Sequence, residues 1–179
     1  MNKKLTEKEK KEVLDSLTIV IDTREKNNKH ILKYFDENGI KYISRKLDHA
    51  DYSYMYYYHE KPYFCDDEIA IERKANIDEL IGNIKEEKRF KIELLSLNVK
   101  GIRTFLFIEN PNYFRDIRIG AYRSEYKPET LISRIKKSIE LRHNIPIIPM
   151  DKSIIASEIY LTFQSHLYNK LKAGKKIGE

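Results

Sequence analysis

The sequence is poor in residues on which several classes of protein depend. Cys65 is its single cysteine, so an internal disulfide is excluded, and no Cys/His grouping has the spacing of zinc ligands. The histidines also lack the paired spacing that a tyrosine-nucleophile nuclease would need. No glycine-rich phosphate loop occurs, so no nucleotide cofactor is expected. A disulfide framework, a zinc finger and a nucleotide-binding loop are therefore excluded.

Long apolar runs are absent too. None approaches the roughly 20 residues that span a bilayer, so no membrane association is expected. The first residues, MNKKLTEKEKKEVL, are charged throughout and lack the apolar core of a secretion signal. We therefore expect an intracellular protein, in the cytoplasm or nucleoid, or in the host cytoplasm if it is phage-encoded.

The remaining composition is that of a folded domain. Of the 179 residues, 41% are hydrophobic and 35% charged, which excludes a disordered chain and is enough to build one core. The net charge of +6 favours an anionic partner, although many basic proteins have no such partner. One globular domain is expected.

The hydrophobic periodicity predicts an alternation of helices and strands. Helices are expected at 6–17, from 31 to Gly39, at 76–97, 129–143 and 153–171, and strands at 18–22, 40–47, 51–58, 68–74, 102–110 and 145–148. Thr6 and Glu9 have the spacing of a capping box at the start of the first helix, and Asn76 is the expected N-cap of the third. We expect polar or irregular connections at 59–64 and 111–127. This order predicts an α/β fold with a mixed central β-sheet flanked by helices.

The strand predicted at 68–74 carries candidate catalytic residues. Side chains alternate along a strand, so Glu72 and Lys74 share one face while Arg73 points to the other. A carboxylate can bind a divalent cation while the lysine contacts a phosphate or a water molecule. Asp51 and Asp22 can supply further acids if their strands pair nearby. For the tripeptide alone, a solvated charge run is the simpler interpretation.

Several motifs in chain order resemble those of the XPF-type structure-specific endonucleases, including the archaeal Hef nuclease, of the PD-(D/E)xK superfamily. IDTRE resembles the family's Asp-x-Arg-Glu, and LDHADY resembles its Leu-x-x-Gly-Asp-Tyr. EIAIERKANIDEL is similar to its Glu-Arg-Lys followed by Asp, and Arg89, Phe90 and Glu93 resemble residues of its long helix. These motifs and the strand FLFIEN lie at 21–25, 47–52, 68–80, 89–93 and 105–110. The resemblance implies a restriction-endonuclease-like fold.

The resemblance also implies roles for individual residues. Asp22, Asp51 and Glu72 would bind Mg²⁺ or Mn²⁺, with Arg73 and Lys74 acting on the phosphate and the water. Glu25 and Asp78 would support the site. Arg24 and Arg89 would contact DNA, although each can equally be a structural ion-pair residue, Arg89 with Glu93 one turn away.

Two departures from the family pattern stand out. Ala50 replaces the glycine before Asp51, which matters if the turn needs a positive φ. The stretch from Asp51 to Glu72 is also longer than expected, which we interpret as a lengthened hairpin tip. Relatives generally carry a helix-hairpin-helix domain, and the residues after 171 are too few for one, which suggests by analogy a phage or mobile-element enzyme.

Aromatic and basic residues offer further DNA contacts. The tyrosines between 52 and 58 can stack on unpaired bases, although strand packing is the simpler interpretation. The segment 111–127 interleaves tyrosines with basic residues, as a DNA-contacting loop or an ordinary solvated loop would. Its candidate DNA-binding residues are Arg115, Arg118 and Arg123.

The function expected from these features is a Mg²⁺-dependent endodeoxyribonuclease selective for flaps, forks or junctions, acting in DNA repair or recombination. The alternatives are a catalytically inactive DNA-binding module and a junction resolvase or nickase of the same superfamily. The helix at 153–171 is apolar on more than one side, so a homodimer is a possible working form. We expect an N-terminal helix at 1–17, the nuclease domain at 18–172 and a basic tail at 173–179.

Overall fold

The computed structural model describes residues 5–173 and residue 177. The chain divides into two compact units. The first comprises residues up to Ile69 together with those from Ala156 onward, and the second runs from Ala70 to Ile155. None of the helices in the described part of the chain is both long and apolar enough to cross a membrane.

Four strands lie in the described residues of the first unit. Strand β1 (Thr18–Ile21) pairs in parallel with β2 (Tyr42–Ser44) and antiparallel with β3 (Tyr52–Tyr58), which forms a hairpin with β4 (Lys61–Phe64). The register of β1 and β3 aligns Ile21 with Tyr52. Because the two strands are antiparallel, Asp22, which follows Ile21, and Asp51, which precedes Tyr52, lie at the same end of the pair. Parallel and antiparallel pairs together make a mixed sheet, as predicted.

Strand β4 corrects one prediction. Residues 59–64 were expected to be a polar, proline-containing connection, but 61–64 form a strand in register with β3. The hairpin turn is made by His59 and Glu60, whose φ angles are 48° and 62°. The usual sequence signals for such a turn are Asn and Gly, so these two residues hide it. Pro62 also argues against a central strand, yet it is tolerated at a sheet edge.

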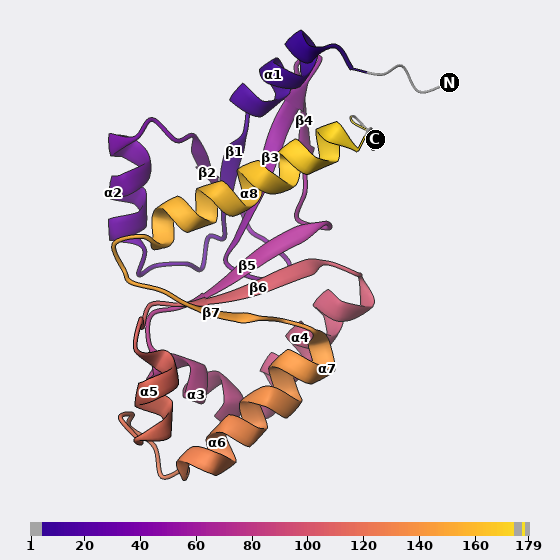
Figure 1. The fold of residues 1–179 in the computed structure, drawn as a ribbon. Coiled ribbons are helices and arrows are strands. Elements are labelled where there is room, and N and C mark those ends of the chain that lie inside the picture. Colours follow the sequence, from indigo (N-terminus) through magenta and orange to yellow (C-terminus); the bar gives the residue numbers. More distant parts are fainter. Residues whose placement is uncertain (1–4, 174–176, 178–179) are drawn as a thin grey trace. The chain divides into compact units, whose positions relative to one another are not determined.

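The part of the first unit that the structure describes also forms the helices α1 (Glu7–Asp15), α2 (Lys29–Glu37) and α8 (Ile155–Lys172). The predicted capping box of α1 is confirmed, because Thr6 and Glu9 exchange hydrogen bonds. Helix α8 crosses the strands of this unit (Figure 1), and Phe163 packs on Tyr54 with 5.5 Å between ring centroids. The strand and the helix thus share one core.

The tyrosine cluster of β3 serves mainly that core. Tyr52, Tyr54 and Tyr56 are among the largest fully buried side chains of the protein. Tyr54 donates to or accepts from Nδ1 of His166 across 2.9 Å, and burial raises the pKa of its phenol well above the usual value. Strand packing, rather than base stacking, accounts for these three residues.

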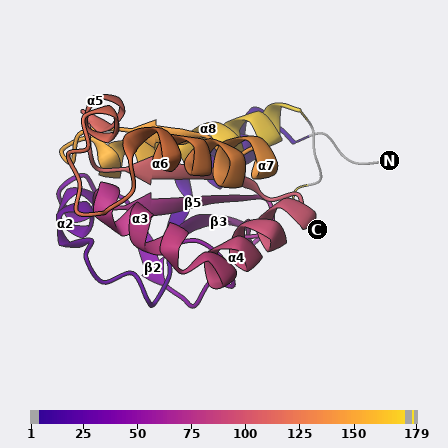
Figure 2. The same ribbon diagram turned by 90° about the horizontal axis from the view of Figure 1, so that it is seen from below.

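The second unit contains strands β5 (Ile69–Lys74, from Ala70 onward), β6 (Arg103–Ile108) and β7 (Ile147–Pro149), and β6 and β7 are parallel. Its helices are arranged in two rows, which Figure 2 shows side by side. One row is α3 and α4, the other α6 and α7, and α4 contacts both β6 and α7. The bounds are Ile77–Lys85 for α3, Glu87–Val99 for α4, Tyr113–Arg118 for α5, Pro128–Ile135 for α6 and Leu141–His143 for α7.

The helix predicted at 76–97 is in fact two helices. Its backbone leaves the helical region at Glu86, where ψ is 45°. The buried positions of α3 recur every three or four residues up to Ile84, and among the positions whose burial is described the next buried residue is Phe90. This gap of six residues breaks the apolar stripe, so one straight helix cannot bury both halves.

Of the predictions for residues 111–143, one needs correction and the other is confirmed. The stretch 111–127 was expected to be irregular, but it contains α5, whose Tyr113 and Ile117 are buried one turn apart. The helix predicted at 129–143 is present with a π-helical segment at Lys136–Glu140. Of the predicted tail 173–179, residues 174–176, 178 and 179 lie outside the described residues. The bounds predicted for the nuclease domain stay a prediction.

Candidate active site

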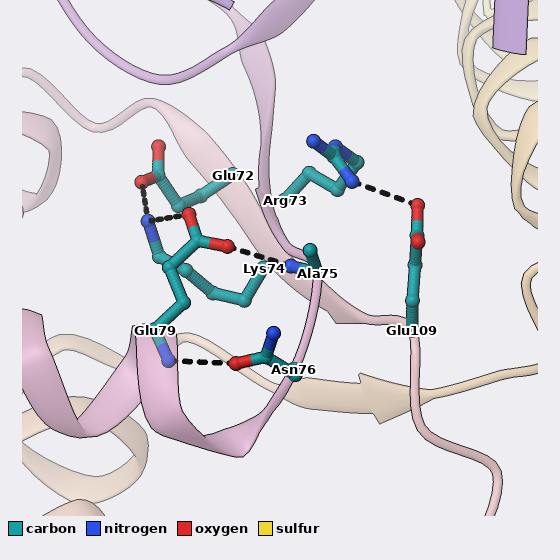
Figure 3. A network of polar contacts seen from close by, with 7 residues as sticks. All are labelled: Glu72, Arg73, Lys74, Ala75, Asn76, Glu79 and Glu109. Atoms are coloured by element: carbon teal, nitrogen blue, oxygen red, sulfur yellow. Dashed lines mark hydrogen bonds and ion pairs between the residues drawn. The ribbon is translucent and has the colours of Figure 1, made fainter. Parts of the chain in front are cut away.

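The alternation predicted for β5 is confirmed and separates its charged side chains. Glu72 and Lys74 lie on one side of the strand and Arg73 on the other, as Figure 3 shows. Lys74 Nζ donates to Glu72 Oε1 over 2.5 Å, and both side chains are at most 10% exposed. A buried, charged strand end needs a specific role, because isolated charges are costly to bury. The interpretation of these residues as a solvated charge run is therefore wrong.

The surroundings of Glu72 are rich in negative charge. Burial raises the pKa of Glu72, and Lys74 offsets this effect only in part, because Glu93 and Glu79 act in the same direction as burial. Glu79 Oε1 also lies 3.9 Å from Lys74 Nζ. One ammonium thus faces several carboxylates, and such a surplus of oxygen donors suits a hard divalent cation.

Helix α3 begins directly after this pair and fixes the orientation of Glu79. Asn76 caps the helix by accepting from the backbone N–H of Glu79 over 2.9 Å, and Glu79 Oε2 accepts from the N–H of Ala75 over 2.8 Å (Figure 3). Sequence reasoning identified the Asn76 cap but missed Glu79. Its place three residues after the cap was the available signal.

Arg73 points away from Glu72 and Lys74. Its Nη1 donates to Glu109 Oε1 over 2.8 Å, and both side chains are 3% exposed. The backbone N–H of Glu109 donates to the carbonyl of Lys74 over 2.9 Å. Glu109 therefore links the end of β6 to the end of β5 twice, a role that sequence reasoning missed. The predicted role of Arg73 at the phosphate stays a prediction.

In the first unit, Asp22 is buried in a dense set of hydrogen bonds. Its Oδ1 accepts from the N–H and Nε of Arg24, both over 2.7 Å, and its Oδ2 accepts from the N–H of Leu47 over 2.6 Å. Burial alone would raise the pKa of Asp22, but the Arg24 and Leu47 donors outweigh it and hold the pKa below the usual value. Asp22 is therefore an ionised, preorganised carboxylate.

Arg24, predicted to contact DNA, bridges two parts of the first unit. Its Nη2 donates to Asp22 Oδ2 over 3.1 Å and to the carbonyl of Leu47 over 2.9 Å. The carbonyl of Asp51 accepts from the N–H of Asp22 over 2.8 Å. Arg24 and this backbone bond hold Asp22 beside the turn that leads to Asp51. A structural role is thus established for Arg24, and a DNA contact stays a proposal.

Ala50, in that turn, has a φ of 62° and is buried. This is the left-handed region, in which an L side chain costs roughly 1–2 kcal/mol and glycine does not. The glycine expected from the family pattern is therefore the residue that this backbone favours. The chain keeps the turn with alanine at a cost in stability.

We expect Ala50→Gly to raise the free energy of unfolding by about 1 kcal/mol, because the strain is relieved at a site already shaped for glycine. Urea unfolding of both proteins measures the change. Ala156→Gly, at a buried position within α8, is the matched control and should instead destabilise by about 1 kcal/mol. A destabilised Ala50→Gly would contradict strain at this turn.

The sequence matches the ERCC4 domain over residues 21–160. The chain belongs to the ERCC4 domain family. Among solved structures it is similar to XPF from Aeropyrum pernix, with a TM-score of 0.61 and 17% identity over 87% of this chain and 68% of that one. The structure of XPF from Aeropyrum pernix in complex with DNA gives a TM-score of 0.59 and 19% identity over 86% and 65%. No curated protein matches the sequence.

These similarities confirm the resemblance to XPF-type nucleases, for the nuclease domain alone, and the restriction-endonuclease-like fold. This chain spans about two thirds of the length of the solved XPF chains. Within the described residues, 5–173 and 177, no group of three or more His, Cys, Asp or Glu side chains that could hold a metal ion is present. The predicted ligand set therefore stays a proposal, although its members are all carboxylates, whose oxygens are ligands that Mg²⁺ prefers.

The other residues predicted to support the site or to bind DNA differ in their contacts and in their exposure. Asp78 Oδ1 accepts from the N–H of Arg123 over 2.6 Å and so ties the segment after α5 to α3. Arg115 forms an ion pair with Asp116, and Arg118 Nη1 donates to the carbonyl of Phe114. Arg89 is exposed on α4, whereas Glu25 is half-buried.

Proposed function

We propose that this ERCC4 domain is a metal-dependent DNA endonuclease that hydrolyses phosphodiester bonds in branched DNA inside the cell. The observation that carries the proposal is the buried Glu72–Lys74 pair at the end of β5, with its surplus of nearby carboxylates. Buried titratable groups with shifted pKa values are typical of active sites. Membership of the ERCC4 domain family supports the same assignment.

In this proposal Asp22, Asp51 and Glu72 would hold Mg²⁺ or Mn²⁺ through carboxylate oxygens. The bound cation would stabilise negative charge on the phosphate and make an attacking water more acidic. Lys74 is a donor only, so it positions the water or a phosphate oxygen rather than the cation. Arg24 keeps Asp22 ionised and oriented, and Glu109 keeps the end of β5 in register. Glu25 and Asp78 support these groups.

DNA is the proposed partner. The solved XPF of Aeropyrum pernix has been described in a complex with DNA, and the net charge of +6 on this chain favours a polyanion. In the second unit Arg115, Arg118 and Arg123 provide exposed cations for phosphate contacts, and Arg89 adds one on α4. Contacts between these arginines and DNA phosphates would contribute to the affinity for DNA, but they would not select a base sequence.

The test is incubation of the pure protein with labelled flap, fork, Holliday-junction and duplex DNA, with and without Mg²⁺ or Mn²⁺. We expect cleavage of the branched DNAs that requires the metal, and little cleavage of the duplex. Binding without cleavage under every condition would favour the inactive DNA-binding module. Symmetric cutting of the Holliday junction alone would favour the resolvase, and single-strand nicking of duplex the nickase.

A homodimer remains part of the proposal. Most apolar residues of α8 are buried, but Leu161 and Tyr168 are about half exposed and lie two helical turns apart. Two shallow pockets of about 340 and 480 Å³ adjoin them in the first unit, both bordered by Leu14 and Gln164. The apolar surface formed by Leu161 and Tyr168 is suited to a twofold contact with a second copy of the chain. Light scattering with and without a DNA junction measures the mass, and a monomer in both conditions rejects the dimer.

A further inference from the structure

Helix α5 presents large apolar side chains to solvent among arginines. Phe114 is 54% exposed, and Ile119, which directly follows the helix, is 68% exposed. Residues four apart share a helical face, so Phe114 lies beside Arg118 and Arg115 beside Ile119. The opposite face, with Tyr113 and Ile117, is buried. We call Phe114, Arg115, Arg118 and Ile119 the α5 surface.

The α5 surface is tied to the end of β5 through the segment that follows β6. The N–H of Glu109 donates to the carbonyl of Lys74 over 2.9 Å. The next residue, Asn110, accepts from the N–H of Asn112 over 2.8 Å and donates to Asp116 Oδ2 over 3.1 Å. A short chain of hydrogen bonds within the second unit thus leads from Lys74 to α5.

A second anchor holds the residues after α5. The N–H of Arg123 donates to Asp78 in the first turn of α3, the helix that begins three residues after Lys74. The ring of Tyr126 lies between Lys85 of α3 and Arg134 of α6, 5.8 and 5.1 Å from its centroid. Both ends of the α5 surface are therefore fixed against elements that adjoin Lys74.

The combination of arginines and exposed apolar side chains identifies the kind of partner. Arginines attract phosphates, and a lone basic patch would bind any duplex. Intact duplex buries the faces of its base pairs, whereas a branch point exposes the face of the last pair and unpaired bases. Aromatic and aliphatic side chains gain free energy by packing on such faces. The two kinds of residue together fit a DNA branch.

We propose that Phe114 and Ile119 pack against the exposed bases at a DNA branch and give this domain its preference for branched DNA over duplex. This proposal rests on the proposed function, because it names the substrate feature that the same site recognises. Arg115 and Arg118 contact the flanking phosphates. Lys74 then acts on a phosphodiester bond close to the branch.

The test of the proposal is the affinity of three variants for fork DNA and for duplex DNA. The variants are Phe114→Ala, Ile119→Ala and the double variant. Binding is measured with Ca²⁺ in place of Mg²⁺, so the readout does not depend on cleavage. We expect the affinity of the double variant for the fork to fall about tenfold or more, because both side chains that pack on the exposed bases are lost. Affinity for duplex should stay within about twofold, since phosphate contacts remain.

Two further variants serve as controls. Phe114→Trp keeps an aromatic face and should retain the fork preference. Leu141→Ala removes an even more exposed apolar side chain from α7, outside the α5 surface, and should change neither affinity. Equal losses on fork and duplex, or an unchanged fork preference, would overturn the proposal, as would a wild-type protein that binds both DNAs equally. Failure to cleave any DNA with Mg²⁺ or Mn²⁺ would instead reject the proposed function, and the binding comparison would still stand.

Discussion

Glu72→Gln should reduce the rate of DNA cleavage by more than about a hundredfold, since loss of an outer partner of a metal ligand already costs about 10–100-fold. The amide keeps the shape of the side chain and can still accept from Lys74, but it lacks the negative charge that a divalent cation requires. Asp51→Asn should have a comparable effect for the same reason. Cleavage of a labelled fork over time, with Mg²⁺ and with Mn²⁺, measures both variants.

Lys74→Ala distinguishes the residues that bind the metal from the residue that only donates hydrogen bonds. We expect a similar loss of cleavage but nearly unchanged affinity for the metal, because an ammonium group donates hydrogen bonds and cannot coordinate a cation. Titration calorimetry with Mn²⁺ provides the second readout. A loss of metal affinity equal to that of Asp51→Asn would contradict the assignment and make Lys74 a residue that merely holds Glu72.

The control for these variants is Glu12→Gln, which makes the same chemical change on an exposed carboxylate of α1. It should cleave at the wild-type rate. Thermal unfolding confirms that each variant is folded at the assay temperature. Near wild-type cleavage by both Glu72→Gln and Asp51→Asn would reject the proposed active site.

Local patterns in the sequence were sufficient to predict much of the fold. The capping box at Thr6 and the alternation of Glu72, Arg73 and Lys74 follow from rules that act over a few residues. The family resemblance rested on motifs of the same short range. These are features that do not depend on distant parts of the chain.

What the sequence could not predict depends on partners distant along the chain. Nothing near Arg73 indicates that its partner is Glu109, 36 residues later. For Arg24 the sequence left a DNA contact and a structural ion pair as equal alternatives, because its hydrogen bond to the carbonyl of Leu47 becomes visible only when the chain is folded. The strand β4 was missed because His59 and Glu60 adopt positive φ angles that their types seldom adopt.

The Arg73–Glu109 pair carries the second large prediction. Glu109→Ala should lower the free energy of unfolding by about 3–5 kcal/mol, the usual cost of removing one partner of a buried ion pair. The cost is high because Arg73 is 3% exposed and a guanidinium cannot shed its charge by losing a proton. Urea unfolding followed by circular dichroism measures the loss.

A double-mutant cycle distinguishes the pair from simple loss of packing. Arg73→Met alone should also destabilise, because it leaves the carboxylate of Glu109 buried beside an apolar side chain. Arg73→Met combined with Glu109→Leu removes both charges and fills the space, so it should lie closer to wild type than either single variant. Strictly additive losses would contradict a coupled pair.

Activity of the same variants shows whether the pair serves stability alone. The backbone bond from Glu109 to the carbonyl of Lys74 does not require either side chain, so the double variant keeps the register of β5 and β6. If Arg73 only supports the strand, the double variant should cleave DNA at close to the wild-type rate well below its unfolding temperature. A folded double variant that is about a hundredfold slower would instead assign Arg73 a direct contact with the phosphate, as a donor that is missing from the reaction costs about that much.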